Sequence, residues 1–183
     1  LTHALFYDAA WAKVRALNGL QAAGVDYRGP LRLQAYDEGD RSNTQIYVDG
    51  QNNVYVDTQR APYSRSGDTK HDFALSDDGR FHVIGDYSKV LRVGHDGYLY
   101  LGDIPSDPNS LNGVFEHTGH HLIHQEDNKF LTTGVSSYTP FVDSVNRGAR
   151  SDWHLHTADG KEVVPSRVNQ HSFRASTAGS ASQ

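Results

Sequence analysis

Hydrophobic and polar residues alternate along most of this chain. From residue 31 onward, short runs place an apolar side chain at every second position, which is the period of a β-strand with one buried face. Asp-Gly pairs, which suit tight hairpin turns, follow several of these runs. The pattern predicts twelve strands, at residues 45–48, 53–57, 72–75, 80–84, 90–93, 98–101, 114–117, 121–124, 129–132, 140–143, 152–155 and 162–164.

The N-terminal segment has a different period. Between residues 4 and 17, apolar side chains recur three or four positions apart, which predicts an amphipathic helix of about four turns. Asn18 and Gly19 supply a helix stop, and Gly29 with Pro30 breaks the chain again before the strands begin. The apolar stripe consists of Leu5, Ala9, Ala12 and Ala16.

These two periods divide the chain into three parts. We expect an N-terminal helix and connector over residues 1–30 and a β domain over residues 31–170. Residues 171–183 are small and polar, and such a composition predicts a flexible tail because it buries too little apolar surface to offset its ordering entropy. The chain begins with Leu1 instead of methionine, so we expect a processed product or a fragment of a longer protein.

The spacing of the predicted strands suggests an internal repeat. Aligned in order, the strands form three groups of four, offset by about 40 residues. The clearest set of equivalent positions is Phe73, Phe115 and Trp153, separated by 42 residues (73 to 115) and 38 residues (115 to 153). A polar residue, Asp72, Asn112 or Asp152, stands one to three positions before each of these aromatic residues.

The third group resembles a known family of folds. Residues 126–133 (Glu-Asp-Asn-Lys-Phe-Leu-Thr-Thr) and 151–155 (Ser-Asp-Trp-His-Leu) are similar to the fascin-like and ricin-like branches of the β-trefoil superfamily, in which a Gly-Lys-Tyr-Leu strand precedes a Trp-x-Leu strand. The resemblance covers residues 45 to about 165. Asn128 stands where glycine is usual and the Gln-x-Trp triplet is absent, which counts against an inherited galactose-type site.

The resemblance implies an all-β, β-trefoil-like barrel, in which three four-strand repeats close six strands into a barrel and a triplet of hairpins caps one end. The N-terminal helix would precede it. The alternative is a small β-propeller, whose blades also have four strands and a similar repeat length. A propeller needs about four or more blades, and this chain supplies about three, so we predict the β-trefoil.

Composition narrows the classes of function. Seventeen Lys and Arg residues against 22 Asp and Glu give a net charge of −5, so we expect no nucleic-acid partner. The purely apolar runs are far shorter than the ~20 residues of a membrane-spanning helix, so we expect no membrane span. The absence of cysteine excludes thiolate nucleophiles and zinc-thiolate sites. A polar chain with 10 tyrosines suits a secreted, extracellular protein.

Histidine is enriched, with 11 copies. His154 and His156 share one face of a predicted strand, where two imidazoles could hold a metal ion. We predict a solvent-facing strand surface there instead, with no metal and no cofactor. Residues 117–124 carry four histidines, and strand alternation divides them between two faces, so they do not converge on one point.

The sequence contains no Gly-x-Ser-x-Gly elbow, His-Glu-x-x-His helix or phosphate-binding glycine loop, so nothing in it indicates catalysis. Carbohydrate recognition needs only an aromatic ring for the apolar face of a sugar and nearby Asp or Asn side chains for its hydroxyls. Three loop regions offer this mixture. The candidate ligand-binding residues are Asp57, Tyr63, Tyr100, Asp103, Asp127, Asn128 and Tyr138.

We therefore predict a secreted recognition module that binds carbohydrate, such as a cell-surface glycan, through these loops. One alternative is a protein-binding module, a protease inhibitor or a cytoskeletal binder, that uses the proline-containing loops at residues 59–70 or 104–112. A further alternative is a glycan hydrolase with a pair of carboxylates, because two acids at a useful distance are compatible with the sequence.

Overall fold

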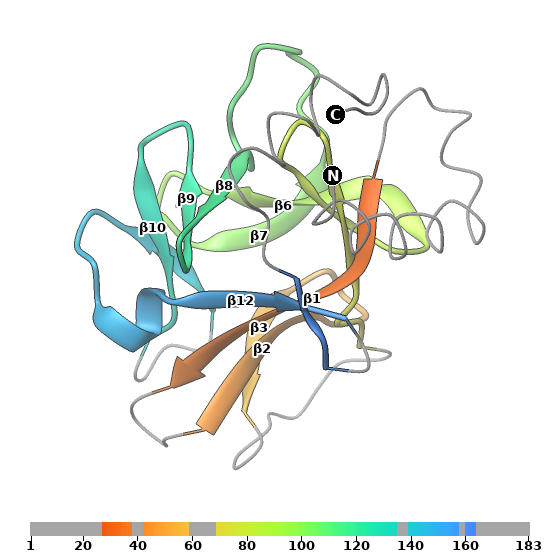
Figure 1. The fold of residues 1–183 in the computed structure, drawn as a ribbon. Helices are drawn as coiled ribbons and strands as arrows, with labels where there is room; N and C mark the ends of the chain where they lie inside the picture. The colour runs from red at the N-terminus through yellow and green to blue at the C-terminus, as the bar shows by residue number, and fades with distance from the viewer. Residues whose placement is uncertain (1–26, 38–41, 59–68, 135–138, 158–159, 164–183) are drawn as a thin grey trace, which may run out of the picture.

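The computed structural model describes residues 27–37, 42–58, 69–134, 139–157 and 160–163, and the regular secondary structure of these residues is almost entirely β-strand (Figure 1). The predicted N-terminal helix and C-terminal tail lie outside the described residues. The strands are β1 (Tyr27–Asp37), β2 (Ser42–Val48), β3 (Val54–Thr58), β4 (Phe73–Ser76), β5 (Phe81–Val83), β6 (Asp86–Val93), β7 (Leu99–Asp103), β8 (Phe115–Thr118), β9 (His121–His124), β10 (Lys129–Thr132), β11 (Phe141–Asp143), β12 (Trp153–His156) and β13 (Glu162–Val163), and a short 3-10 helix, η2 (Gly148–Ser151), precedes β12.

Each of the twelve predicted strands is present, and β1 is an additional strand that the sequence analysis did not predict. In β1, Leu31, Leu33 and Ala35 are all buried, so the strand does have the expected period of two. Gly29 and Pro30 predict a break in the chain, whereas in the structure they lie inside the strand. The strand begins before residue 31, and the division of the chain into three parts stays a prediction.

β1 lies at the centre of the sheet topology. Its first part pairs with β4, and its second part pairs antiparallel with β12 on one edge and β2 on the other. The larger sheet runs β13-β12-β1-β4-β5-β6-β7, with β2 and β3 attached to β1, and the smaller sheet runs β11-β10-β9-β8. The backbone N–H of Phe115 donates to the Gly79 carbonyl at 2.9 Å, and that of Trp153 donates to the His120 carbonyl at 2.6 Å. These bonds join the two sheets into a nearly closed barrel.

The barrel encloses a continuous apolar core. Phe73, Phe115 and Trp153 begin β4, β8 and β12, and none is more than 3% exposed. The indole Nε1–H of Trp153 donates to the Leu131 carbonyl at 2.8 Å, which satisfies the one polar atom of its side chain. The three aromatic residues thus hold corresponding places in their strands, while the internal sequence repeat stays a prediction.

A buried histidine makes the core sensitive to acid. His82 in β5 is only 2% exposed, and its Nδ1 lies 2.7 Å from the Tyr87 carbonyl, which can only accept a hydrogen bond. Burial lowers the pKa of His82 below the ordinary value of 6.5, although the Tyr87 carbonyl and the Asp78 carboxylate partly oppose this effect and the Arg80 cation adds to it. The folded protein therefore holds His82 neutral in a range where the unfolded chain takes up a proton.

We expect the free energy of unfolding to fall as the pH drops below about 6.5. The contribution from His82 is fully present above the unfolded-state pKa, declines by at most about 1.4 kcal/mol per pH unit, and levels off below the folded-state pKa. Urea unfolding between pH 8 and pH 5 measures the effect, and an NMR titration of the His82 ring measures its pKa directly. A ring that titrates above 6.5 in the folded protein would contradict this prediction.

Candidate functional site

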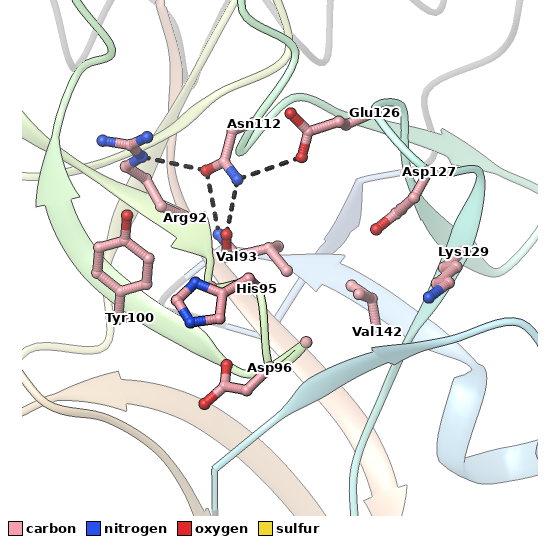
Figure 2. A pocket seen from close by; sticks show the side chains of 12 residues that line it. Arg92, Val93, His95, Asp96, Tyr100, Asn112, Glu126, Asp127, Lys129 and Val142 are labelled. Atoms are coloured by element: carbon pink, nitrogen blue, oxygen red, sulfur yellow. Dashed lines mark hydrogen bonds between the residues drawn. The ribbon is translucent and has the colours of Figure 1, made fainter.

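A pocket of about 470 Å³ lies between the β6–β7 hairpin and the β9–β10 turn (Figure 2). In the view of Figure 2, Tyr100, His95 and Asp96 stand on one side, and the β9–β10 side carries most of the remaining charged groups. The β6–β7 turn is held by a hydrogen bond from the Gly97 N–H to the Gly94 carbonyl at 2.8 Å. The pocket is lined by Arg92, Val93, Gly94, His95, Asp96, Gly97, Tyr100, Asn112, Glu126, Asp127, Lys129 and Val142.

Asn112 connects the two sides of the pocket. Its Oδ1 accepts hydrogen bonds from the Val93 N–H at 3.2 Å and from the Arg92 Nε at 3.1 Å. Its Nδ2 donates to the Val93 carbonyl at 2.6 Å and to Glu126 Oε1 at 3.3 Å. The amide thus pairs with Val93 as a neighbouring strand would, and its side chain is fixed in one orientation. Asn112 thus contacts both Arg92 and Glu126.

Tyr100 provides an aromatic surface that is 40% exposed. It lies directly opposite Arg92 in the β6–β7 pair, and the guanidinium carbon is 5.7 Å from the centre of the ring, within the range of a cation–π contact. Arg92 NH1 also donates to the Asp103 carbonyl at 3.3 Å. The ring is therefore held by a cation whose position depends on Asn112.

Asp127 is an exposed carboxylate that is oriented by a buried group. His124 is 0% exposed, and its Nε2 accepts the Gly113 N–H at 2.8 Å. In the neutral ring, Nδ1 then carries the proton and donates to Asp127 Oδ1 at 3.0 Å. These two hydrogen bonds connect the backbone of Gly113, which precedes β8, through the buried His124 ring to Asp127 in the pocket lining.

Four of the predicted ligand residues have described side chains, and two of these four line one pocket. Tyr100 and Asp127, predicted in different loops, line the same pocket. Asp103 lies at the end of β7, where Lys89 Nζ donates to it at 2.7 Å and lowers the pKa of the carboxyl, and it does not line the pocket. Asn128 has a positive φ of 58° and forms the β9–β10 turn, which explains an Asn where glycine is usual.

The other three predicted ligand residues are not placed by the structure. Asp57 lies in β3 opposite Gln45, but its side chain is outside the described residues. Tyr63 and Tyr138 are also outside them. The prediction that these residues bind a ligand remains untested.

Sequence reasoning did not predict Arg92, Asn112, Glu126 or Lys129 as part of a site. Arg92 was predictable from the sequence. The strands predicted on either side of the Asp96-Gly97 turn form a hairpin that places Arg92 on the same face as Tyr100. In the sequence, Asn112 stands out only as the polar residue before Phe115 in the predicted repeat. Its pairing with Val93 spans 19 residues and depends on the tertiary fold.

Comparison with known proteins shows the fold. No family model matches the chain, and no curated protein matches it. The β-trefoil lectin of the Vibrio vulnificus hemolysin/cytolysin, solved with N-acetyl-D-lactosamine bound, has 16% sequence identity to this chain and a TM-score of 0.51, covering 69% of this chain and 93% of the lectin. GalNAc-T7, solved with UDP, GalNAc and Mn²⁺, has 15% identity and a TM-score of 0.48, covering 68% of this chain and 22% of that protein.

The first likeness and the nearly closed barrel agree with the predicted β-trefoil, and the propeller alternative is wrong. A propeller would place separate four-stranded blades around a channel, whereas here β12, β1, β4 and β5 are consecutive neighbours around one core. Among the residues that the structure describes, no helix has the length and apolarity needed to cross a membrane.

Proposed function

We propose that this chain is a carbohydrate-binding module that holds a sugar in the pocket between the β6–β7 hairpin and the β9–β10 turn. The observation that carries the proposal is that an exposed tyrosine, Tyr100, lines the same pocket as the carboxylates of Asp127 and Glu126. A pyranose ring has an apolar face that packs on an aromatic ring, and its hydroxyls donate strong hydrogen bonds to carboxylates.

The charges of the pocket favour a neutral glycan. Asp96, Glu126 and Asp127 outnumber the cations Arg92 and Lys129, so a sulfated or phosphorylated sugar would meet net repulsion. The Vibrio lectin with a bound neutral disaccharide supports this class of ligand at the level of the shared fold. We further propose that the glycan lies outside the cell, on a cell surface or polymer. Several of these shallow sites, bound to one surface at the same time, would raise the overall avidity.

We expect a glycan array to show binding to neutral glycans, and Tyr100→Ala and Asp127→Ala each to weaken the affinity for the strongest hit about tenfold or more. Titration calorimetry measures this loss, starting with N-acetyllactosamine as the probe. The matched control is Tyr98→Ala, because Tyr98 is 39% exposed, packs on Phe141 and does not line the pocket.

Two results would contradict the proposal. One is an array on which no neutral glycan binds. The other is a Tyr98→Ala variant that loses as much affinity as Tyr100→Ala, because the ring in the pocket would then have no special role.

A protein-binding module is a second candidate, supported by the loop between β7 and β8. Ile104 and Leu111 in this loop are 43% and 47% exposed. Arg80 anchors the same loop, since its guanidinium donates to the Asn112 carbonyl at 2.5 Å and to the Ser110 carbonyl at 2.7 Å. A blank glycan array together with stoichiometric inhibition of a protease would favour this function. Glycan hydrolysis by a carboxylate pair stays a prediction.

A further inference from the structure

Two histidines and a glutamate gather outside the pocket, at the opposite end of β9. They are His120 in the β8–β9 turn, His154 in β12 and Glu162 in β13, and one ring nitrogen or carboxylate oxygen from each lies within 4.8 Å of the others. The ring centroids of His120 and His154 are 4.9 Å apart, and His154 Nδ1 is 2.7 Å from Glu162 Oε2. Among the described residues, this is a cluster with the composition of a metal site.

The fold explains why these three residues meet. Trp153 and Leu155 face the core, so His154 faces outward, and the β12–β13 pairing places Glu162 on the same outer face. The hydrogen bond from the Trp153 N–H to the His120 carbonyl then brings the β8–β9 turn against β12. His120 and Glu162 are exposed and His154 is half-buried, so an ion could enter from solvent.

We propose that His120, His154 and Glu162 bind a divalent transition-metal ion, with Zn²⁺ as the best match. Zinc prefers imidazole nitrogen and carboxylate oxygen ligands in tetrahedral geometry, and three protein ligands would leave one position for water. Zinc bonds of 2.0–2.1 Å separate tetrahedral ligands by roughly 3.3 Å. The three ligand atoms of the cluster all lie within 4.8 Å of one another, so the cluster is compact enough to surround one ion.

This site differs from the pair that the sequence suggested. Strand alternation pairs His154 with His156, its neighbour on the same strand face, and we predicted a solvent-facing surface without a metal there. In the structure, the Nδ1 of His156 is 3.0 Å from the Thr157 carbonyl, and His156 is not part of the cluster. The second histidine comes instead from the β8–β9 turn, 34 positions earlier in the sequence (120 to 154).

A bound ion would add a further link between the β12–β13 hairpin and the β8–β9 turn, which the hydrogen bond from the Trp153 N–H to the His120 carbonyl already joins. Because the unfolded chain does not hold the three ligands together, zinc would bind the folded state preferentially. We therefore expect the melting temperature to rise with zinc concentration.

The test is a calorimetric titration of the chelator-treated full chain with ZnCl₂, together with thermal melts in EDTA and in excess Zn²⁺. We expect one ion per chain at this cluster, and we expect His120→Asn and Glu162→Gln each to weaken its binding at least about 100-fold and to abolish the zinc-dependent rise in melting temperature. The matched control is His156→Asn, which should bind zinc as the unaltered chain does. Urea unfolding in EDTA shows whether each variant is folded.

The proposal is overturned if the unaltered chain binds no zinc, or if His120→Asn and Glu162→Gln bind it as tightly as the unaltered chain. It is also overturned if His156→Asn loses binding while His120→Asn retains it, because the strand pair would then be the site. Glycan binding is measured separately in EDTA, so failure of this proposal leaves the carbohydrate proposal standing, and the reverse also holds.

Discussion

Replacing Trp153 with alanine should destabilise the protein by about 3–5 kcal/mol, the usual cost of removing a large aromatic side chain from a packed core. Trp153 is 0% exposed and belongs to the continuous hydrophobic core of the barrel. The substitution also removes the donor to the Leu131 carbonyl, leaving a buried acceptor without its bond. Since a domain of this size is typically stable by about 5–15 kcal/mol, this one change would consume much of its stability.

Urea unfolding at pH 7.5 measures this effect, and two controls separate its causes. Trp153→Phe retains most of the ring volume but lacks the N–H, so it should lose only about 1–3 kcal/mol. Tyr98→Ala removes a ring that is 39% exposed and packs on Phe141, so it should cost much less stability than Trp153→Ala. If Trp153→Ala lost less than about 1 kcal/mol, Trp153 would not occupy the centre of the core, and the barrel would be assembled differently.

Many strands of this fold were predictable because only one face is buried, although β4 and β5 are buried at every residue. Burial of alternate residues gives a period of two that is visible in the sequence, as in Phe115 and His117 of β8. β1 was missed although Leu31 and Leu33 follow the same rule, because glycine and proline normally end a strand and here lie within one.

The pocket was harder to predict because it joins residues that are distant in the sequence. Tyr100 and Asp127 belong to different loops in the sequence, so the spacing of residues alone places them in separate candidate sets. The structure unites them, because Asn112 bonds to both Val93 in β6 and Glu126 after β9. Such pairings depend on how the hairpins pack, which the period of a single strand does not encode.

The same reasoning applies to the histidines. Alternation correctly predicted that those at residues 117–124 divide between faces, since His124 is buried while His121, on the other face of β9, is partly exposed. His120 was expected on the same face as His124, but it lies in the turn before β9 and is exposed. It paired His154 with His156 because these share a strand face. The meeting of His154 with His120 required the contact between β12 and the β8–β9 turn, which only the tertiary structure shows.

Replacing His124 with leucine should affect both stability and the pocket, because this buried ring bonds in both directions. Leucine cannot accept the Gly113 N–H, and leaving that donor unpaired should cost about 1–3 kcal/mol. Urea unfolding measures this loss.

The second effect of His124→Leu is on ligand binding. Asp127 would lose the Nδ1–H donor that holds its carboxylate, so the affinity for the glycan hit should fall although His124 itself does not line the pocket. A double-mutant cycle with Asp127→Ala tests whether the effect passes through Asp127. If it does, the double variant should bind no more weakly than Asp127→Ala alone. Fully additive losses would show that His124 acts on the pocket by another route, and an unchanged affinity in His124→Leu would show that it does not position Asp127 for binding.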